Sequence, residues 1–398
     1  MSHILIIGGG PSGLRAAEVA SNAGMRVTLC DQTRSVGRKF LVAGKGGLNL
    51  THSEEIETFA TRYQGPDQPH DFWPRALADF DNKEIRAWAA RLNVGTFVQK
   101  SGRIYPKALK AAPLLRRWVE KLRKQGVDFR MSHRLVSLTS GKASFEGPEG
   151  KIEIQANAII LALGGGSWPQ TGSDGAWVET LEKAGVKVSP LAPANCGWEV
   201  AWSSDLAEQL EAKPLKNVVA SAGDKIAPGE IMITRYGMEG GPLYTLGPVL
   251  RRMDKPLLTL DFKPTFAIEK LVGKMESAKK NFLAESQYRW KLSESMRLIL
   301  DHFHGPFSSA EHLAQHAKAC RIPLTKTRPI EEAISSSGGV PWQTINDQLM
   351  IKSLPGIFVA GEMIDWEAPT GGYLLQGCFA SGTRAAEAAL AFKISKPG

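Results

Sequence analysis

The sequence has few cysteines and no long apolar run. Its four cysteines are scattered over 398 residues without a C-x-x-C pair, at Cys30, Cys196, Cys320 and Cys378. This argues against a disulfide framework or a dithiol redox relay, and for a reducing compartment. No apolar stretch approaches the roughly 20 residues of a membrane span, and the first expected strand leaves no room for a signal peptide. We therefore predict a cytoplasmic protein without a membrane partner or a disulfide partner.

The composition is that of a folded protein. Hydrophobic residues make up 43% and charged residues 22% of the chain, which excludes disordered and fibrous classes. The length predicts two or three units. The net charge of +9 suggests a polyanionic partner.

The first fifteen residues have the pattern of a dinucleotide-binding turn. An apolar run, 4–7, is followed by Gly8-x-Gly10-x-x-Gly13 and then by a helical pattern. In this fingerprint Gly8 allows the tight turn, Gly10 lets backbone amides approach a pyrophosphate, and Gly13 lets helix and strand pack closely. The helix N-terminus would supply free N–H groups to the phosphates. A Gly-rich turn that binds nothing is the alternative.

A second apolar run ends at Asp31, where an acid can accept hydrogen bonds from a ribose. The loop 34–51 that follows is rich in glycine and cations. It could follow a phosphate chain to the reactive end of a cofactor, with Arg38 and Lys39 as charge partners and Gly46 and Gly47 allowing close approach. A flexible surface loop is the alternative.

Two further buried strands are expected, at 158–163 before Gly164 and at 356–361 before a small-residue helix. We therefore predict an α/β fold with a discontinuous Rossmann-like cofactor domain, residues 1–190 and 323–398. The insertion is expected to have a β-rich part, 191–265, and a small helical part, 266–322. Strand-like alternation between 129 and 154 predicts a β-meander.

Residues 100–124 are strongly basic, with nine cations and one acid, and Tyr105 and Trp118 lie among them. A polyanion such as RNA could bind there, because cations neutralise phosphates and aromatic rings stack on bases. A solvated helix face is the alternative.

Histidines 302, 304, 312 and 316 have spacings that metal ligands can have. No companion cysteine or acid cluster accompanies them, so we expect surface or capping histidines and no metal.

Four segments together resemble the HI0933-like (BaiN-like) flavoprotein family, close to the glutathione-reductase-type FAD fold. They are GGGPSG, GRKFLVAGKGGLNLT, ALGGGSWPQTGSDG and GIFVAGEMIDWEAPTGGYLLQGCFASG. The resemblance covers both predicted segments of the cofactor domain, and it implies FAD rather than NAD at the fingerprint.

The resemblance also implies roles for particular residues. Gly8, Gly10, Ser12 and Gly13 would hold the pyrophosphate, Asp31 the adenosine ribose, and the Val136 backbone the adenine; Gly361, Glu362 and Asp365 would lie along the ribityl-phosphate, and Gly372, Tyr373 and Gln376 near the isoalloxazine. Together with the loop residues Arg38, Lys39, Gly46 and Gly47, the expected cofactor set also holds Pro11, Gln32, Asn49, Ala162 and Gly164.

The sequence departs from the family pattern at one position. Many members have Gly-Gly-Arg-Cys-Asn where this chain has Gly46-Gly47-Leu48-Asn49. A mechanism that uses a cysteine acid beside the flavin is therefore in doubt here.

The predicted activity is an FAD-dependent reduction of a conjugated C=C bond with hydride from NAD(P)H. The resemblance implies either a small steroid-like enone or a uridine in ribosomal RNA as substrate. A nearby acid must protonate the acceptor carbon; Tyr373 and Lys45 are the candidates, with Asn49 orienting flavin or substrate. Packing of Tyr373 against the ring is its alternative role. The alternative functions are an FAD-dependent hydroxylase and a flavin-bearing RNA-binding protein without catalysis.

Overall fold

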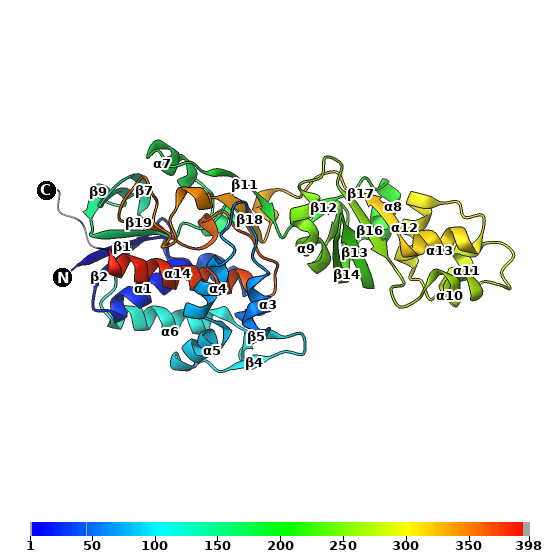
Figure 1. The fold of residues 1–398 in the computed structure, drawn as a ribbon, viewed down its shortest axis with the longest axis horizontal. Helices are drawn as coiled ribbons and strands as arrows, with labels where there is room; N and C mark the ends of the chain where they lie inside the picture. The colour runs from blue at the N-terminus through cyan, green and yellow to red at the C-terminus, as the bar shows by residue number, and fades with distance from the viewer. Residues whose placement is uncertain (1, 45, 393–398) are drawn as a thin grey trace. The chain divides into compact units, whose positions relative to one another are not determined.

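The chain folds as two units, of which the first is built from both ends of the sequence. The computed structural model describes residues 2–44 and 46–392. Residues 1–192 and 335–398 form the first unit, and residues 193–334 form the second. Figure 1 shows the N-terminal and C-terminal segments together in the first unit.

A five-stranded parallel sheet is the centre of the first unit. Ile4–Ile7 pair with Ala158–Leu161 on one side and with Val27–Cys30 on the other, and they are at most 2% exposed. The order of the strands confirms the predicted Rossmann-like sheet shared by both ends of the chain. That order is β19 (Ile357–Val359), β10 (Ala158–Leu161), β1 (His3–Ile7), β2 (Arg26–Asp31) and β6 (Asp128–Met131).

Helices α1 (Pro11–Asn22) and α14 (Tyr373–Ala391) pack on each other beside this sheet (Figure 1). Small residues permit the contact, since a Cβ at Gly382 would lie 2.5 Å from the backbone oxygen of Ser12. The Ser381 hydroxyl also accepts a hydrogen bond of 3.0 Å from the backbone N–H of Gly361. The last helix is therefore fixed against the first glycine-rich turn.

A buried carboxylate holds three helices of the first unit together. Glu18 of α1 is 1% exposed and accepts hydrogen bonds of 2.9 Å from the indole N–H groups of both Trp88 and Trp118. Lys121 donates to its other oxygen at 2.5 Å, and Arg15 lies at 3.5 Å. A buried charge is tolerated only when it is partnered in this way.

Smaller elements complete the first unit. The predicted meander is the antiparallel sheet of β7 (Arg134–Thr139), β8 (Lys142–Gly147) and β9 (Gly150–Gln155), and a second small sheet contains β3 (Thr51–His52), β5 (Arg103–Pro106) and β4 (Thr96–Val98). The remaining helices are α2 (Arg38–Ala43), α3 (Ile56–Ala60), α4 (Phe72–Asp79), α5 (Asn82–Arg91), α6 (Ala111–Lys124) and α7 (Trp177–Lys183), with the 3-10 turns η1 (Pro169–Thr171), η3 (Trp342–Thr344) and η4 (Gly361–Met363).

The chain leaves the first unit along β11 (Ser189–Ala194) and returns along β18 (Ser335–Gly339). These two strands pair with each other in a two-stranded sheet. Gly338 sits at the pairing with φ +83°, where a Cβ would lie 2.1 Å from the backbone oxygen of Pro190. The exit and the return are therefore neighbours.

The second unit is one six-stranded antiparallel sheet with helices that share its core. The chain returns to the first unit at Ser335, later than the expected residue 323. The reason is that β17 (Cys320–Pro323) pairs with β16 (Leu257–Asp261) and completes this sheet. The expected helical part is not a separate unit, since helix and strand residues form one apolar cluster. The sheet order is β12 (Trp198–Glu199), β15 (Gly237–Glu239), β14 (Lys225–Thr234), β13 (Pro214–Ala222), β16 (Leu257–Asp261) and β17 (Cys320–Pro323). The helices are α8 (Ser204–Leu210), α9 (Gly241–Leu250), α10 (Ile268–Gly273), α11 (Phe282–Arg289), α12 (Glu294–His304) and α13 (Ala310–Lys318), with the turn η2 (Ile330–Glu332).

Three of the four histidines of the second unit contact one another. The rings of His304 and His316 stack with centroids 4.2 Å apart, and His312 lies 5.0 Å from His316. In the described part of the chain, no group of three or more ligand-type residues has a geometry that could hold a metal ion.

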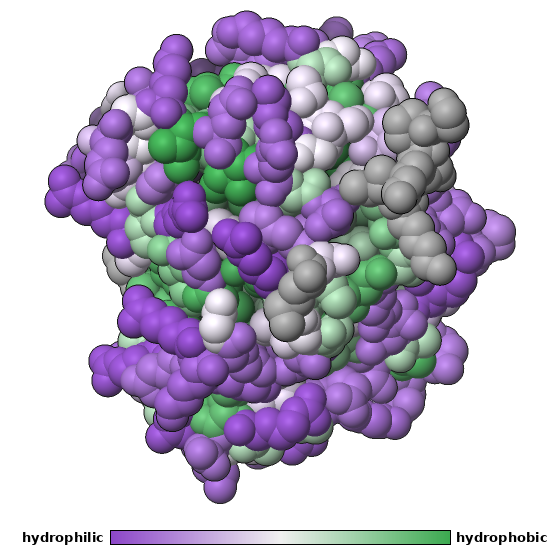
Figure 2. Space-filling model, turned by 90° about the vertical axis from the view of Figure 1, so that its left-hand side faces the viewer, coloured by the Kyte–Doolittle hydropathy of each residue, from purple (hydrophilic) through white to green (hydrophobic). Residues whose placement is uncertain are grey.

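The basic stretch 100–124 is partly used inside the first unit. Its Trp118 is fully buried beside Glu18, so this ring cannot stack on a base, contrary to expectation. Lys121 is bound to Glu18, and Arg117 donates to the backbone oxygen of Leu92 at 3.2 Å. Figure 2 shows one face of the first unit, where polar side chains surround small apolar areas.

Among the described residues, no helix is long and apolar enough to span a membrane. Cys30, Cys320 and Cys378 are free thiols, and Cys30, Cys196 and Cys320 are buried.

Candidate functional site

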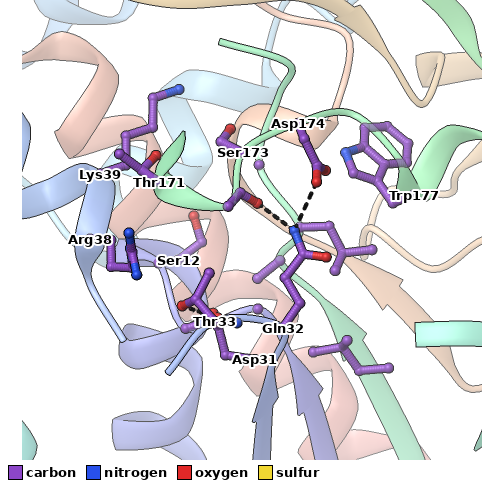
Figure 3. A pocket seen from close by; sticks show the side chains of 18 of the residues that line it. Ser12, Asp31, Gln32, Thr33, Arg38, Lys39, Thr171, Ser173, Asp174 and Trp177 are labelled. Atoms are coloured by element: carbon purple, nitrogen blue, oxygen red, sulfur yellow. Dashed lines mark hydrogen bonds between the residues drawn. The ribbon is translucent and has the colours of Figure 1, made fainter. Parts of the chain in front are cut away.

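A pocket lies at the carboxyl ends of β1, β2 and β10, where ligands bind in open α/β sheets. Figure 3 shows its polar side chains converging from the glycine-rich turn, the segment after β2 and the segment before α7. Eleven of the predicted cofactor residues line it: Gly8, Gly10, Pro11, Ser12, Asp31, Gln32, Arg38, Lys39, Ala162, Gly164 and Glu362.

The three fingerprint glycines differ in what surrounds them. Gly8 has φ +106°, and a Cβ there would lie 2.2 Å from the backbone oxygen of Ala162. A Cβ at Gly13 would lie 1.9 Å from the backbone oxygen of Gly8, so this glycine serves close packing. A Cβ at Gly10 would meet no atom within 4 Å. Gly10 therefore keeps space open at the start of α1, as its predicted role requires.

The start of α1 offers backbone donors to an anion. Gly10 caps the helix without a side-chain hydrogen bond, and Pro11 occupies the first turn. The N–H groups that follow have no intrahelical acceptor, and the helix dipole adds partial positive charge. This end of the helix can hold a phosphate group.

Asp31 fixes the turn that it faces. Its Oδ2 accepts a hydrogen bond of 2.6 Å from the backbone N–H of Gly9, and its Oδ1 accepts bonds from the backbone and hydroxyl of Thr33 at 2.8 and 2.7 Å. The carboxylate is thus held in one orientation at the pocket, with lone pairs left for a ribose hydroxyl.

The wall of the pocket formed by residues 171–174 is held by hydrogen bonds from the segment after β2. The Gln32 amide donates to the backbone oxygen of Gly172 at 2.8 Å and to Asp174 at 3.3 Å (Figure 3). Arg38 is exposed and donates to the backbone oxygen of Gln170 at 3.0 Å. These contacts position Asp174 and the turn before it over the pocket.

An ion pair forms another part of the lining. The Lys39 ammonium lies 2.8 Å from Glu362 and donates to the Ser167 hydroxyl at 2.7 Å. The other Glu362 oxygen accepts a bond of 2.9 Å from the backbone N–H of Ser336. Cys378 also lines the pocket, and burial raises the pKa of its thiol to about 11, so it stays protonated at neutral pH.

A buried polar atom in the pocket lining has no partner among the described residues. It is Nε1 of Trp177; Oδ1 of Asn49, outside the lining, is likewise unpartnered. An unpartnered buried polar atom is costly unless a ligand or water meets it. Together with the open space at Gly10 and the fixed carboxylate of Asp31, the Trp177 donor shows that the residues present fit a dinucleotide cofactor.

Other predicted cofactor residues make contacts within the protein. Gln376 is fully buried, accepting from Thr51 at 2.7 Å and donating to the Phe80 backbone oxygen at 2.6 Å. A Cβ at Gly361 would lie 2.2 Å from the Ser12 hydroxyl, and one at Gly372 would lie 2.6 Å from the Thr51 backbone. All three residues therefore serve packing in the protein without ligand.

Asp365 and Val136 also lie outside the pocket lining. Asp365 is buried and accepts from the backbone N–H of Gly338 at 3.2 Å, and burial raises the pKa of its carboxyl. Leu135, the neighbour of Val136, lines the pocket, and Val136 does not. Gly46 and Gly47 do not line the pocket either, and a Cβ at Gly47 would approach Tyr105 at 3.5 Å.

Of the candidate acids, Tyr373 is engaged with the protein and Lys45 lies outside the described residues. The Tyr373 hydroxyl donates to Glu54 at 2.8 Å, and its ring packs 4.7 Å from that of Phe59. Burial first, and then the bond to Glu54, raise the pKa of Tyr373. This arrangement resembles the packing role more than that of a ready proton donor.

Glu54 is held between two donors. Burial raises the pKa of Glu54, but hydrogen bonds from Arg62 and Tyr373 outweigh it, so the net pKa lies below its usual value. Arg62 contacts both carboxylate oxygens. Leu48, which stands in the departure from the family pattern noted above, is a core residue at 1% exposure.

Sequence reasoning missed several lining residues. Thr33 and Trp177 carry no motif of their own. Ser173 and Asp174 lie in the segment ALGGGSWPQTGSDG, which contributed to the family resemblance, but they were not singled out as cofactor residues.

Comparison with known proteins agrees with the fold. The 3-dehydro-bile acid delta(4,6)-reductase of Clostridium scindens is 28% identical and aligns over 98% of this chain and 99% of its own length. The ribosomal RNA dihydrouridine synthase of Escherichia coli is 22% identical over 98% of each chain. The crystal structure of a 3-ketosteroid-delta4-(5alpha)-dehydrogenase from Rhodococcus jostii RHA1 has a TM-score of 0.54 at 13% identity, covering 98% of this chain and 97% of that one.

The profile of the HI0933-like protein Rossmann domain matches residues 2–388. This match spans both segments of the first unit and the inserted second unit. The chain therefore belongs to the HI0933-like family, a family of FAD-dependent oxidoreductases with a Rossmann-type cofactor domain.

Proposed function

We propose that this protein reduces a C=C bond conjugated to a carbonyl group, with NAD(P)H as electron donor. The observation that carries the proposal is the pocket itself: an open glycine position at an uncapped helix N-terminus, faced by a fixed carboxylate. Two full-length relatives support the reaction class. One is named a bile acid reductase, and the other a dihydrouridine synthase, whose product is a uracil ring with its conjugated C=C bond saturated.

The proposed cofactor contacts follow from the geometry. FAD supplies hydride transfer when it is bound. The first amides of α1 would hold its pyrophosphate, and Asp31 would accept from the adenosine ribose. The ammonium of Lys39 lies in the lining with Glu362 as its partner, so it could balance phosphate charge while Glu362 accepts from a ribityl hydroxyl. The Asn49 oxygen would accept from a flavin or substrate N–H group.

We propose that the proton comes from an acidic side chain, without assigning it to one residue. A conjugated acceptor takes hydride at one carbon and a proton at the next, so an acid must lie on the substrate side. Tyr373 stays a candidate if substrate binding frees its hydroxyl from Glu54, and Lys45 is the other. The protonated Cys378 thiol lies in the lining but is surrounded by Ser12 and Glu362.

Reduction of the flavin by each pyridine nucleotide tests the electron donor. Holoprotein mixed anaerobically with NADPH or NADH in a stopped-flow instrument should lose its flavin absorbance with at least one of them. The control variant is Gly273→Ala, in which the added Cβ lies in the second unit and meets no atom within 4 Å. Its flavin should be reduced as in the wild type. Unchanged flavin absorbance with both nucleotides would reject NAD(P)H as the electron donor.

Two substrate assays then separate the substrate classes. Reduced protein should be reoxidised anaerobically by a steroid-like enone or by a uridine-containing RNA. Mass spectrometry of ribosomal RNA nucleosides from a deletion strain shows which one is used in the cell. Unchanged dihydrouridine together with enone-dependent reoxidation would assign the small molecule.

A further inference from the structure

The strongest unexplained feature outside the pocket is a group of lysines in the second unit. The ammonium groups of Lys263, Lys270 and Lys274 lie 5.6, 5.0 and 5.5 Å from the centroid of one ring, that of Phe266. We call these four residues the lysine cluster. Each lysine is within cation–π range of the ring, so three positive charges converge on one small area.

These charges have no acidic partner close by. In the part of the chain that the structure describes, no carboxylate lies within ion-pair distance of the three ammonium groups. Two acids of this part of the chain are committed elsewhere: Asp261 pairs with Lys318 at 2.6 Å, and Glu285 pairs with Arg289 at 2.7 Å. The two acids nearest along the chain, Glu269 and Glu276, are exposed and form no ion pair with a described residue.

The convergence is unfavourable without an anion. Burial first, and then the charges of Lys274 and Lys291, lower the pKa of Lys263. Residues 263–291 contain seven cations and three acids. Like charges at such distances repel, and a bound anion would relieve the repulsion.

An exposed aromatic residue precedes a residue that contacts the cluster. Arg289 donates to the backbone oxygen of Lys274 at 3.2 Å, which brings the end of α11 to the cluster. The preceding residue, Tyr288, is 74% exposed, an unusually large value for an aromatic side chain. Figure 1 shows α10 and α11 in the same part of the second unit.

We propose that the lysine cluster and Tyr288 form a binding surface for single-stranded RNA, in which the ammonium groups contact phosphates and Tyr288 stacks on a base. Cations that follow the backbone and an aromatic platform are the two components of such surfaces. The choice of RNA among polyanions rests on the proposed function, one of whose two substrates is a uridine in RNA. An anionic membrane is the less favoured partner, because the Phe266 ring has three ammonium groups around it and, among the described residues 263–291, Tyr288 is the only exposed large hydrophobic side chain.

The test measures RNA binding by the oxidised holoprotein, without any electron donor. Fluorescence anisotropy of a labelled, unstructured RNA of about 12 nucleotides is recorded at several KCl concentrations for the wild type and for Lys270→Gln/Lys274→Gln. We expect the double variant to bind at least about tenfold more weakly. Its salt dependence should fall by about 1.4 in the log–log slope, the value for two lost phosphate contacts on a single strand. Because no reduction takes place, failure of this test is distinct from failure of the proposed reductase.

Tyr288→Ala separates stacking from charge. It should weaken binding about fivefold to hundredfold, in the range of one lost base stack, with the salt slope unchanged. The matched control is Lys216→Gln/Lys225→Gln, which removes two exposed lysines from the sheet of the same unit. Melting curves and flavin absorbance check that every variant is folded and loaded.

Three outcomes would overturn the proposal. Equal weakening by the control and the cluster variant would mean that only net charge matters. Loss of binding in Lys107→Gln/Lys110→Gln, with the cluster variant unaffected, would place RNA on the basic stretch of the first unit. Cluster-dependent sedimentation with vesicles rich in anionic lipid, without RNA binding, would assign a membrane.

Discussion

The two basic regions of the molecule use their charge in different ways. In residues 100–124, Lys121 neutralises a buried carboxylate, Arg117 binds backbone, and Trp118 is part of the core. In residues 263–291, three ammonium groups lie around one ring and, among the described residues, none of the three forms an ion pair. The first region has more cations in the sequence, but the second brings three of them to one small area. Counting charges therefore does not locate a binding surface, because part of the charge is consumed in folding and the rest differs in how closely it converges.

Removal of the carboxylate that the first basic region neutralises should have the largest effect. Glu18→Ala leaves Lys121 and Arg15 without their partner and two indole N–H groups without an acceptor. We expect a loss of about 3–5 kcal/mol in the free energy of unfolding, measured by chemical denaturation. Glu120→Ala, on the exposed face of α6, is the control and should change little. Similar losses in both variants would show that the charges of this region are not consumed in folding.

Gly10→Ala probes the open space at the start of α1. The backbone of Gly10 is extended, with φ −77°, and a Cβ there meets no atom. The apoprotein should therefore fold normally, while FAD binds about a hundredfold more weakly because the methyl group occupies the approach to the pyrophosphate. Titration of apoprotein with FAD by flavin fluorescence measures this, with Gly273→Ala as control. Unchanged FAD affinity would show that the pyrophosphate of FAD does not bind beside Gly10.

The Glu54 contacts should stabilise the first unit in a pH-dependent manner. The pKa of Glu54 in the folded protein lies below its usual value, so its contribution is complete above the unfolded pKa of about 4.3. It is lost as the pH falls through the lowered folded-state pKa. Glu54→Gln should cost about 1 kcal/mol at pH 7, and the difference from wild type should shrink below about pH 4. A difference that is constant with pH would contradict the pKa shift.

Neutralising the second basic region should have the smallest effect on stability. Because Lys270 and Lys274 repel their neighbours, Lys270→Gln/Lys274→Gln should leave the free energy of unfolding unchanged or raise it by up to about 0.5 kcal/mol. The difference between this change in the free energy of unfolding and the loss expected for Glu18→Ala measures how differently the two regions use their charge. A clear loss of stability would mean that these lysines have partners and are not a free surface.

The sequence predicted what is encoded locally and missed what depends on distant contacts. The fingerprint, the strands around it and the pairing of the two chain ends follow from short patterns with known geometry, and the structure confirms the resulting fold. The full burial of Gln376 against Thr51 and Phe80 could not be read from its motif, because these partners are far away in the sequence. Trp118 looked available for the same reason. The lysine cluster did leave a trace, since Phe266, Lys270 and Lys274 recur every four residues.

The pairing of β11 with β18 has an evolutionary consequence. Because the polypeptide departs and comes back through adjacent strands, whatever is carried between them can grow, shrink or be exchanged without altering the path of the sheet that binds the nucleotide. The two units can then diversify separately: the two outer segments of the gene keep the redox unit constant while the inserted segment varies.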